Sequence, residues 1–80
     1  MVIKGNIALS ENGFVFNPST GDSFTINKTG KEVLTLIKEG KSLPAITELM
    51  TEKYDVDTNT LERYLSDFVN DLNVNNLLEE

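Results

Sequence analysis

The chain has 80 residues and a net charge of −6, with thirteen acidic against seven basic side chains. A chain of this length forms one small domain, spanning residues 1–80, with a thin core. It contains no cysteine and no histidine, which excludes disulfides, thiolate catalysis, Cys/His zinc sites and imidazole acid–base chemistry.

The charge and the apolar runs exclude further classes of protein. An acidic surface repels nucleic-acid backbones, because their binding depends on clustered lysine and arginine. No apolar run reaches the roughly 20 residues that span a bilayer. The first residues, Met1-Val2-Ile3-Lys4, lack the plan of a secretion signal, so we expect a cytoplasmic protein.

The first 27 residues predict three antiparallel strands. Ile3, Ile7 and Leu9 fall on alternate positions of a first strand, which Gly5 interrupts. A second strand covers residues 14–16. Residues 17–22 are rich in turn formers and predict a loop.

Asn12-Gly13 separates the first two strands and is typical of a two-residue hairpin turn. Such a turn would place Leu9 opposite Phe16 and Glu11 opposite Phe14. We therefore expect an antiparallel hairpin with this register.

The third predicted strand covers residues 23–26, with Phe24 and Ile26 on one face and Thr25 on the other. It carries neither a charge nor a proline, the residues that usually protect an open sheet edge. An unprotected edge beside an apolar helix is a surface on which an extended peptide can bind. Covering of this edge by the N-terminal segment or by a second copy of the chain is the alternative.

Two short helices follow the strands. The first runs from residue 28 or 30 to 39, with Asn27 and Thr29 as alternative N-caps and Gly40 just past its end. Ser42 is a candidate N-cap for the second. The expected buried face of the second helix consists of Leu43, Ile46, Leu49 and Met50.

The third helix opens at Asp57 or Thr58 and is the longest. Its apolar stripe follows helical spacing and consists of Leu61, Tyr64, Leu65, Phe68, Val69 and Leu72. The stripe is wider than packing on a small core needs, so either one flank faces a groove or the helix lies deep in the core. Strands followed by helices predict an α+β fold, with a three-stranded antiparallel sheet and three helices.

A series of ordinary motifs in a fixed order extends over nearly the whole chain. They lie at residues 17–21, 24–27, Gly30, 33–34, 39–42, 46–49, 54–57, Leu61, 67–72 and 76–78. By their order and spacing the chain resembles the PqqD family, whose members are also called RiPP recognition elements. Two positions differ from the habit of that family: Leu34 stands where many relatives have an aromatic residue, and Asn75-Asn76 where many have a glycine.

The resemblance implies a winged-helix-like fold and a function. Members of the family bind the leader of a ribosomally made precursor peptide as a fourth strand beside strand three, in the cleft against helix three. They present it to a modifying enzyme, often a radical-SAM enzyme. Carried onto this chain, the implied peptide-binding residues are Ser23, Phe24, Thr25, Ile26, Leu61, Tyr64, Leu65 and Phe68.

We expect no catalytic residue and no cofactor, because 80 residues hardly build the pocket that a catalytic carboxylate pair needs. We expect no metal either, because the calcium-loop-like spacing from Asp55 has Thr60 where a glycine is required.

The sequence leaves open the precursor, the product, the partner enzyme and the oligomeric state. It also leaves open the choice between PQQ biosynthesis and another RiPP pathway, and which of the four helix residues face the peptide. A small acidic winged-helix interaction or regulatory domain with a different partner is the alternative. A DNA-binding role is disfavoured, because the exposed face of helix three carries Glu62, Asp67 and Asp71 against Arg63 alone.

Overall fold

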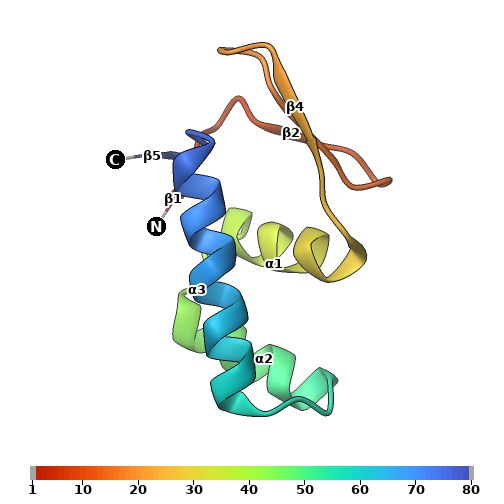
Figure 1. Cartoon of the computed structure of the whole chain (residues 1–80), viewed down its shortest axis with the longest axis vertical. Coiled ribbons are helices and arrows are strands. Elements are labelled where there is room, and N and C mark those ends of the chain that lie inside the picture. The colour runs from red at the N-terminus through yellow and green to blue at the C-terminus, as the bar shows by residue number, and fades with distance from the viewer. Residues whose placement is uncertain (1, 80) are drawn as a thin grey trace.

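The computed structural model describes residues 2–79. A three-stranded antiparallel sheet with the order β2-β3-β4 lies at one end of the molecule (Figure 1). Its strands are β2 (Ala8–Leu9), β3 (Phe14–Asn17) and β4 (Asp22–Thr25). No further strand of the described chain pairs with β4, so β4 is an edge strand.

Three helices complete the α+β fold that the sequence predicts. They are α1 (Lys28–Lys38), α2 (Leu43–Lys53) and α3 (Thr58–Val74). In Figure 1, α3 runs along the length of the molecule, with the sheet near its C-terminal end and α2 beside its N-terminal half. Within residues 2–79, no helix combines the length and the apolar character needed to cross a bilayer.

The observed register of the hairpin between β2 and β3 differs from the predicted register by one residue, so that prediction is wrong. Leu9 lies opposite Val15 and Ala8 opposite Phe16, because the turn holds three residues instead of two. Within this turn only Gly13 adopts the left-handed conformation (φ 83°), as in three-residue hairpin loops built on a type I turn. The observed register puts Leu9 on the same face as the buried Val15, whereas the predicted one would have placed it with the exposed Phe16.

The predicted first strand is also wrong, because its two ends belong to different sheets. A turn at residues 5–6 separates β1 (Val2–Ile3) from β2. β1 pairs instead with β5 (Leu78–Glu79), a strand that the sequence did not predict. Ile3 and Ile7 are nonetheless both buried.

Side-chain caps fix where each helix begins. Asn27 Oδ1 accepts a hydrogen bond from Gly30 N–H at 2.7 Å, so Asn27 and not Thr29 caps α1. Ser42 and Asp57 cap α2 and α3 in the same way. The cap at Asn27 turns the chain directly from β4 into α1, which brings the edge strand and the first helix turn together.

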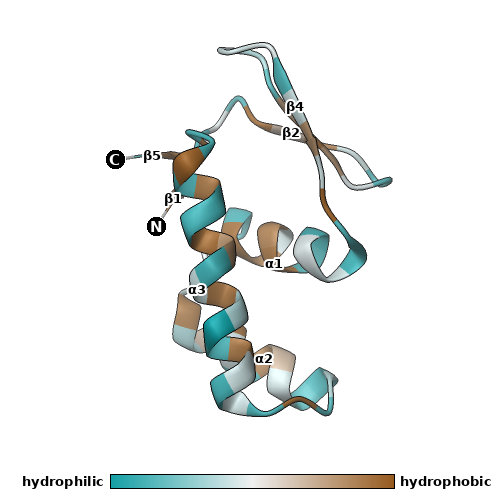
Figure 2. Ribbon diagram, viewed as in Figure 1, coloured by the Kyte–Doolittle hydropathy of each residue, from teal (hydrophilic) through white to brown (hydrophobic). Residues whose placement is uncertain are grey.

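Most of the core lies among the three helices, and β3 adds Val15 to it. Figure 2 shows apolar residues recurring along all three helices. On α2, Ile46 and Met50 are buried as predicted, but Leu49 is 42% exposed, because α2 presents only one narrow side to its neighbours. The buried apolar residues are Ile3, Ile7, Val15, Val33, Leu34, Ile37, Ile46, Met50, Leu61, Leu65, Leu72 and Leu77.

The C-terminus of α3 ends in a Schellman motif that reverses the chain. Leu77 N–H donates to Leu72 C=O at 2.9 Å, and Asn76 N–H donates to Asn73 C=O at 3.1 Å. Asn76 is left-handed (φ 59°), which asparagine tolerates better than other residues with a side chain. The reversal carries Leu77 C=O to within 3.0 Å of Lys4 N–H and leads into the β1–β5 pair.

We predict that Asn76→Ala lowers the free energy of unfolding by about 1 kcal/mol, because alanine lacks the local hydrogen bonding that lets asparagine adopt left-handed backbone. Asn76→Gly should be at least as stable as the wild type. Urea unfolding followed by circular dichroism measures both.

Asn70→Ala is the matched control, since Asn70 is exposed within α3 and alanine favours a helix. It should leave stability unchanged or slightly raised. Equal stability of Asn76→Ala and Asn76→Gly would contradict the role of the left-handed turn.

Candidate functional site

The outer edge of β4 has free main-chain hydrogen-bonding groups. Ile26 N–H donates to Gly13 C=O on the β3 side at 2.8 Å. Because successive residues of an antiparallel strand direct their N–H and C=O groups to opposite sides, Phe24 also pairs with β3. Ser23 and Thr25 therefore direct their N–H and C=O groups away from β3, toward the open edge.

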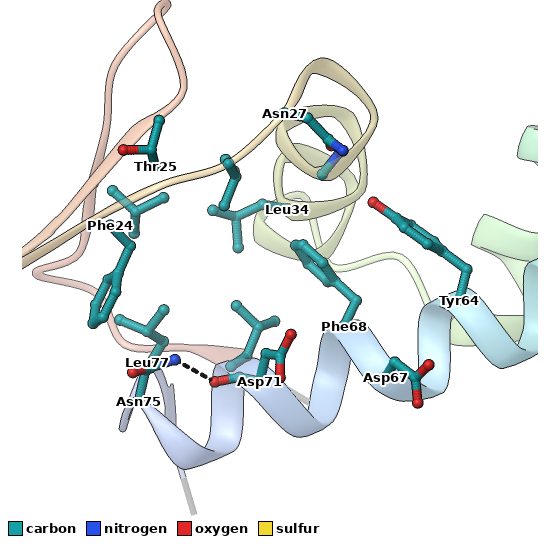
Figure 3. Close-up of a pocket in the computed structure, with 14 residues that line it drawn as sticks. Phe24, Thr25, Asn27, Leu34, Tyr64, Asp67, Phe68, Asp71, Asn75 and Leu77 are labelled. Carbon is teal, nitrogen blue, oxygen red and sulfur yellow. Dashed lines mark hydrogen bonds between the residues drawn. The ribbon is translucent and has the colours of Figure 1, made fainter.

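A groove of about 390 Å³ lies beside this edge, between β4 and α3 (Figure 3). β4 and the segment after it contribute residues 24–27, the start and middle of α1 contribute Gly30 and Leu34, and β3 contributes Val15. The wall from α3 and the segment that follows it consists of Tyr64, Asp67, Phe68, Asp71, Leu72, Asn75 and Leu77.

The apolar stripe of α3 divides between the core and the groove. Leu61 and Leu65 are only 5% and 2% exposed, and they belong to the core. Tyr64 and Phe68 are partly buried and line the groove, and Figure 3 shows both rings projecting from α3 toward the segment around Asn27. Thus one flank of the stripe does face a groove.

Gly30 makes room for Phe68 at the base of the groove. A Cβ atom built on Gly30 would lie 3.2 Å from Phe68 Cε2 and 3.2 Å from Asn27 Oδ1. These separations are tighter than most real side-chain contacts. The absence of a side chain at position 30 therefore lets the Phe68 ring lie against the first turn of α1.

The rings of Tyr64 and Phe68 stack on each other, with centroids 6.2 Å apart and planes 21° from parallel. Burial raises the pKa of the Tyr64 phenol, because the charged phenolate is poorly solvated there. The pair gives the groove an aromatic wall, with the Tyr64 hydroxyl as a polar tip.

Of the eight predicted site residues, five line one groove: Phe24, Thr25, Ile26, Tyr64 and Phe68. Ser23 is exposed on β4 next to them. The structure does not bring Leu61 and Leu65 to the groove, because their side chains point into the core.

Sequence reasoning missed several lining residues, among them Gly30, Leu34, Asp67 and Asp71. Asp67 and Asp71 are one helical turn apart, and no basic residue lines the groove with them. The acids could be placed on the exposed side of the helix from the sequence, but their position beside β4 depends on how α3 packs. Within residues 2–79, no three acidic side chains gather as metal ligands.

The comparisons with known proteins agree with this architecture. A family model described as "PqqD: Coenzyme PQQ synthesis protein D (PqqD)" matches residues 12–78. A solved structure titled "TbiB1 in Complex with the TbiA(beta) Leader Peptide" superposes with a TM-score of 0.90 and 30% sequence identity, covering 99% of this chain and 95% of that chain. No curated protein matches the chain significantly.

The sheet, the three helices and the open edge beside α3 define a small α+β domain of the winged-helix-like class. The match over residues 12–78 goes further, because it covers most of the chain. The chain belongs to the PqqD family, which confirms the resemblance found in the sequence.

We predict that Tyr64 titrates at higher pH in the folded chain than in the unfolded chain. The chain has two tyrosines, so absorbance titration of Tyr54→Phe reports on Tyr64 alone. Since the folded pKa is the higher one, Tyr64 contributes stability that is fully present below the ordinary tyrosine pKa of about 10 and is lost as the pH rises through the folded value.

The same variant titrated in denaturant supplies the reference pKa. A folded midpoint equal to or below the denatured one would show that Tyr64 is not buried against the groove wall as described.

Proposed function

We propose that this protein is a non-catalytic adaptor that binds an extended peptide as a fourth strand along β4 and presents it to a modifying enzyme. The observation that carries the proposal is the open edge of β4 directly beside an apolar groove. Such an edge binds peptides by strand addition, in which main-chain hydrogen bonds supply affinity and side-chain pockets supply selectivity.

The edge of β4 contributes affinity for any extended peptide, and the groove contributes selectivity for its side chains. Ser23 and Thr25 each present one N–H and one C=O to an added strand, whatever its sequence. The groove then contacts alternate side chains of that strand, because residues on adjacent strands at opposed positions point to the same face. Side chains that share the face of Phe24 enter the groove against Leu34 and Phe68.

The peptide is the leader of a ribosomally made precursor. Two findings support this choice: membership of the PqqD family, and the likeness to TbiB1, whose structure was solved with a leader peptide bound. The partner is the enzyme that modifies the precursor, with a radical-SAM enzyme as the kind suggested by the family. A precursor gene and a modifying-enzyme gene encoded beside this chain would identify both.

We predict that Thr25→Pro weakens binding of that leader about tenfold. Proline removes the N–H that faces the open edge, and its ring obstructs the incoming strand, while the pairing of β4 with β3 is kept. The loss of one such hydrogen bond is worth about 1 kcal/mol, and the steric obstruction adds to it. Isothermal titration with the synthetic leader measures the change.

Thr25→Val is the matched control, because it keeps the N–H and the shape of the side chain and loses only the hydroxyl. Its affinity should stay within about twofold of the wild type. A folded Thr25→Pro variant with wild-type affinity would contradict strand addition at this edge.

A further inference from the structure

The groove wall carries two carboxylates that the fold leaves unneutralised. Asp67 and Asp71 both line the groove, and within residues 2–79 neither forms a salt bridge. By contrast, Glu32 on α1 is bound by Lys53 and by the Tyr54 hydroxyl. The groove is therefore a site of negative charge next to an apolar floor.

The folding of α3 does not explain these two acids. Like charges one turn apart on a helix repel each other. Asp71 also lies in the last turn of α3, where the partial negative charge of the helix C-terminus disfavours an acid and where no basic residue stands. Arg63 stands one turn before Asp67 but forms no salt bridge with it in the described chain. Asp71 therefore costs stability in the free protein, and a cationic ligand would relieve the repulsion between the two carboxylates.

The geometry of strand addition determines which ligand side chains come near them. Ligand residues opposite Ser23 and Thr25 direct their side chains to the same face of the sheet as these two residues, away from the groove. The ligand residue opposite Phe24 directs its side chain to the other face and so into the groove beside Phe24. Groove-facing residues therefore recur at every second position, about 7 Å apart. The groove lining offers these side chains two kinds of neighbour, the apolar Phe68 and Leu34 and the acidic Asp67 and Asp71.

Lysine and arginine fit a groove-facing position near Asp67 and Asp71. Their long stems can lie against aromatic rings while the charged end reaches a carboxylate at the rim of the groove. An occupied groove also excludes water, which strengthens the attraction relative to a fully solvated pair.

We propose that the groove selects peptides with a lysine or arginine at a groove-facing position, an even number of residues from an apolar groove-facing residue. This inference rests on the proposed strand addition and specifies its ligand. It assigns Asp67 and Asp71 as specificity-determining residues of the site.

A display library of random 12-residue peptides tests the proposal with the intact protein. Selections are run in parallel on the wild type, on Thr25→Pro and on the double variant Asp67→Asn/Asp71→Asn. The control is Glu48→Gln/Glu52→Gln, which removes two exposed acids with the same one-turn spacing from α2 and changes the net charge equally.

We expect wild-type binders to be enriched in lysine or arginine at an even spacing from an apolar residue, and to bind Thr25→Pro about tenfold more weakly. For a purified binder, Asp67→Asn/Asp71→Asn should weaken affinity roughly three- to tenfold, and the α2 control less than about twofold. Raising the salt concentration should reduce this difference, because rim charges are screened.

The outcomes separate this inference from the proposed function. Binders that depend on Thr25 but show no basic enrichment, or no loss with Asp67→Asn/Asp71→Asn, would overturn the charge selection and leave the adaptor intact. Equal losses in both double variants would mean that only overall charge matters, which also overturns it. If no binder is weakened by Thr25→Pro, the proposed strand addition is wrong, and the proposed preference for basic residues is wrong with it.

Discussion

The main-chain hydrogen bond from Ile26 N–H to Gly13 C=O determines which side of β4 is open. It extends the β3–β4 ladder to the last residue before the α1 cap, and alternation then leaves Ser23 and Thr25 facing outward. A shift of one residue in the pairing of β4 with β3 would turn the N–H and C=O of Phe24 toward the open edge and its ring away from α3. The three-residue turn that ends at Gly13 is therefore part of the site, although it lies outside the groove.

Much of the fold follows from local signals in the sequence. Helical periodicity places the three helices, and Ser42 and Asp57 mark starts because their side chains accept the first free N–H groups. The absence of charge and proline in residues 23–26 predicts an open edge, and β4 is indeed an edge strand. The strand itself is shifted by one residue from the prediction, because it begins at the charged Asp22 and ends at Thr25. The α+β class and the family follow from the order of these elements.

The rest depends on contacts between distant residues. Asn12-Gly13 is compatible with turns of two or three residues, and only packing of Leu9 with Val15 decides between them. β1 and β5 are two residues each and lie at opposite ends of the chain, so no periodic pattern reveals their pairing. The helical stripe could not show that Leu65 enters the core whereas Phe68 enters the groove, because both lie on one continuous apolar face.

Hydrogen–deuterium exchange resolved at single amides shows directly which main-chain groups of β4 are open to an added strand. In the free protein, the amides of Ser23 and Thr25 should exchange rapidly, while those of Phe24 and Ile26 are protected by β3. Binding of the leader should slow exchange at Ser23 and Thr25 and leave Phe24 and Ile26 nearly unchanged. Protection of Ser23 and Thr25 already in the free chain, or rapid exchange of both in the complex, would show that the leader does not add to this edge of β4.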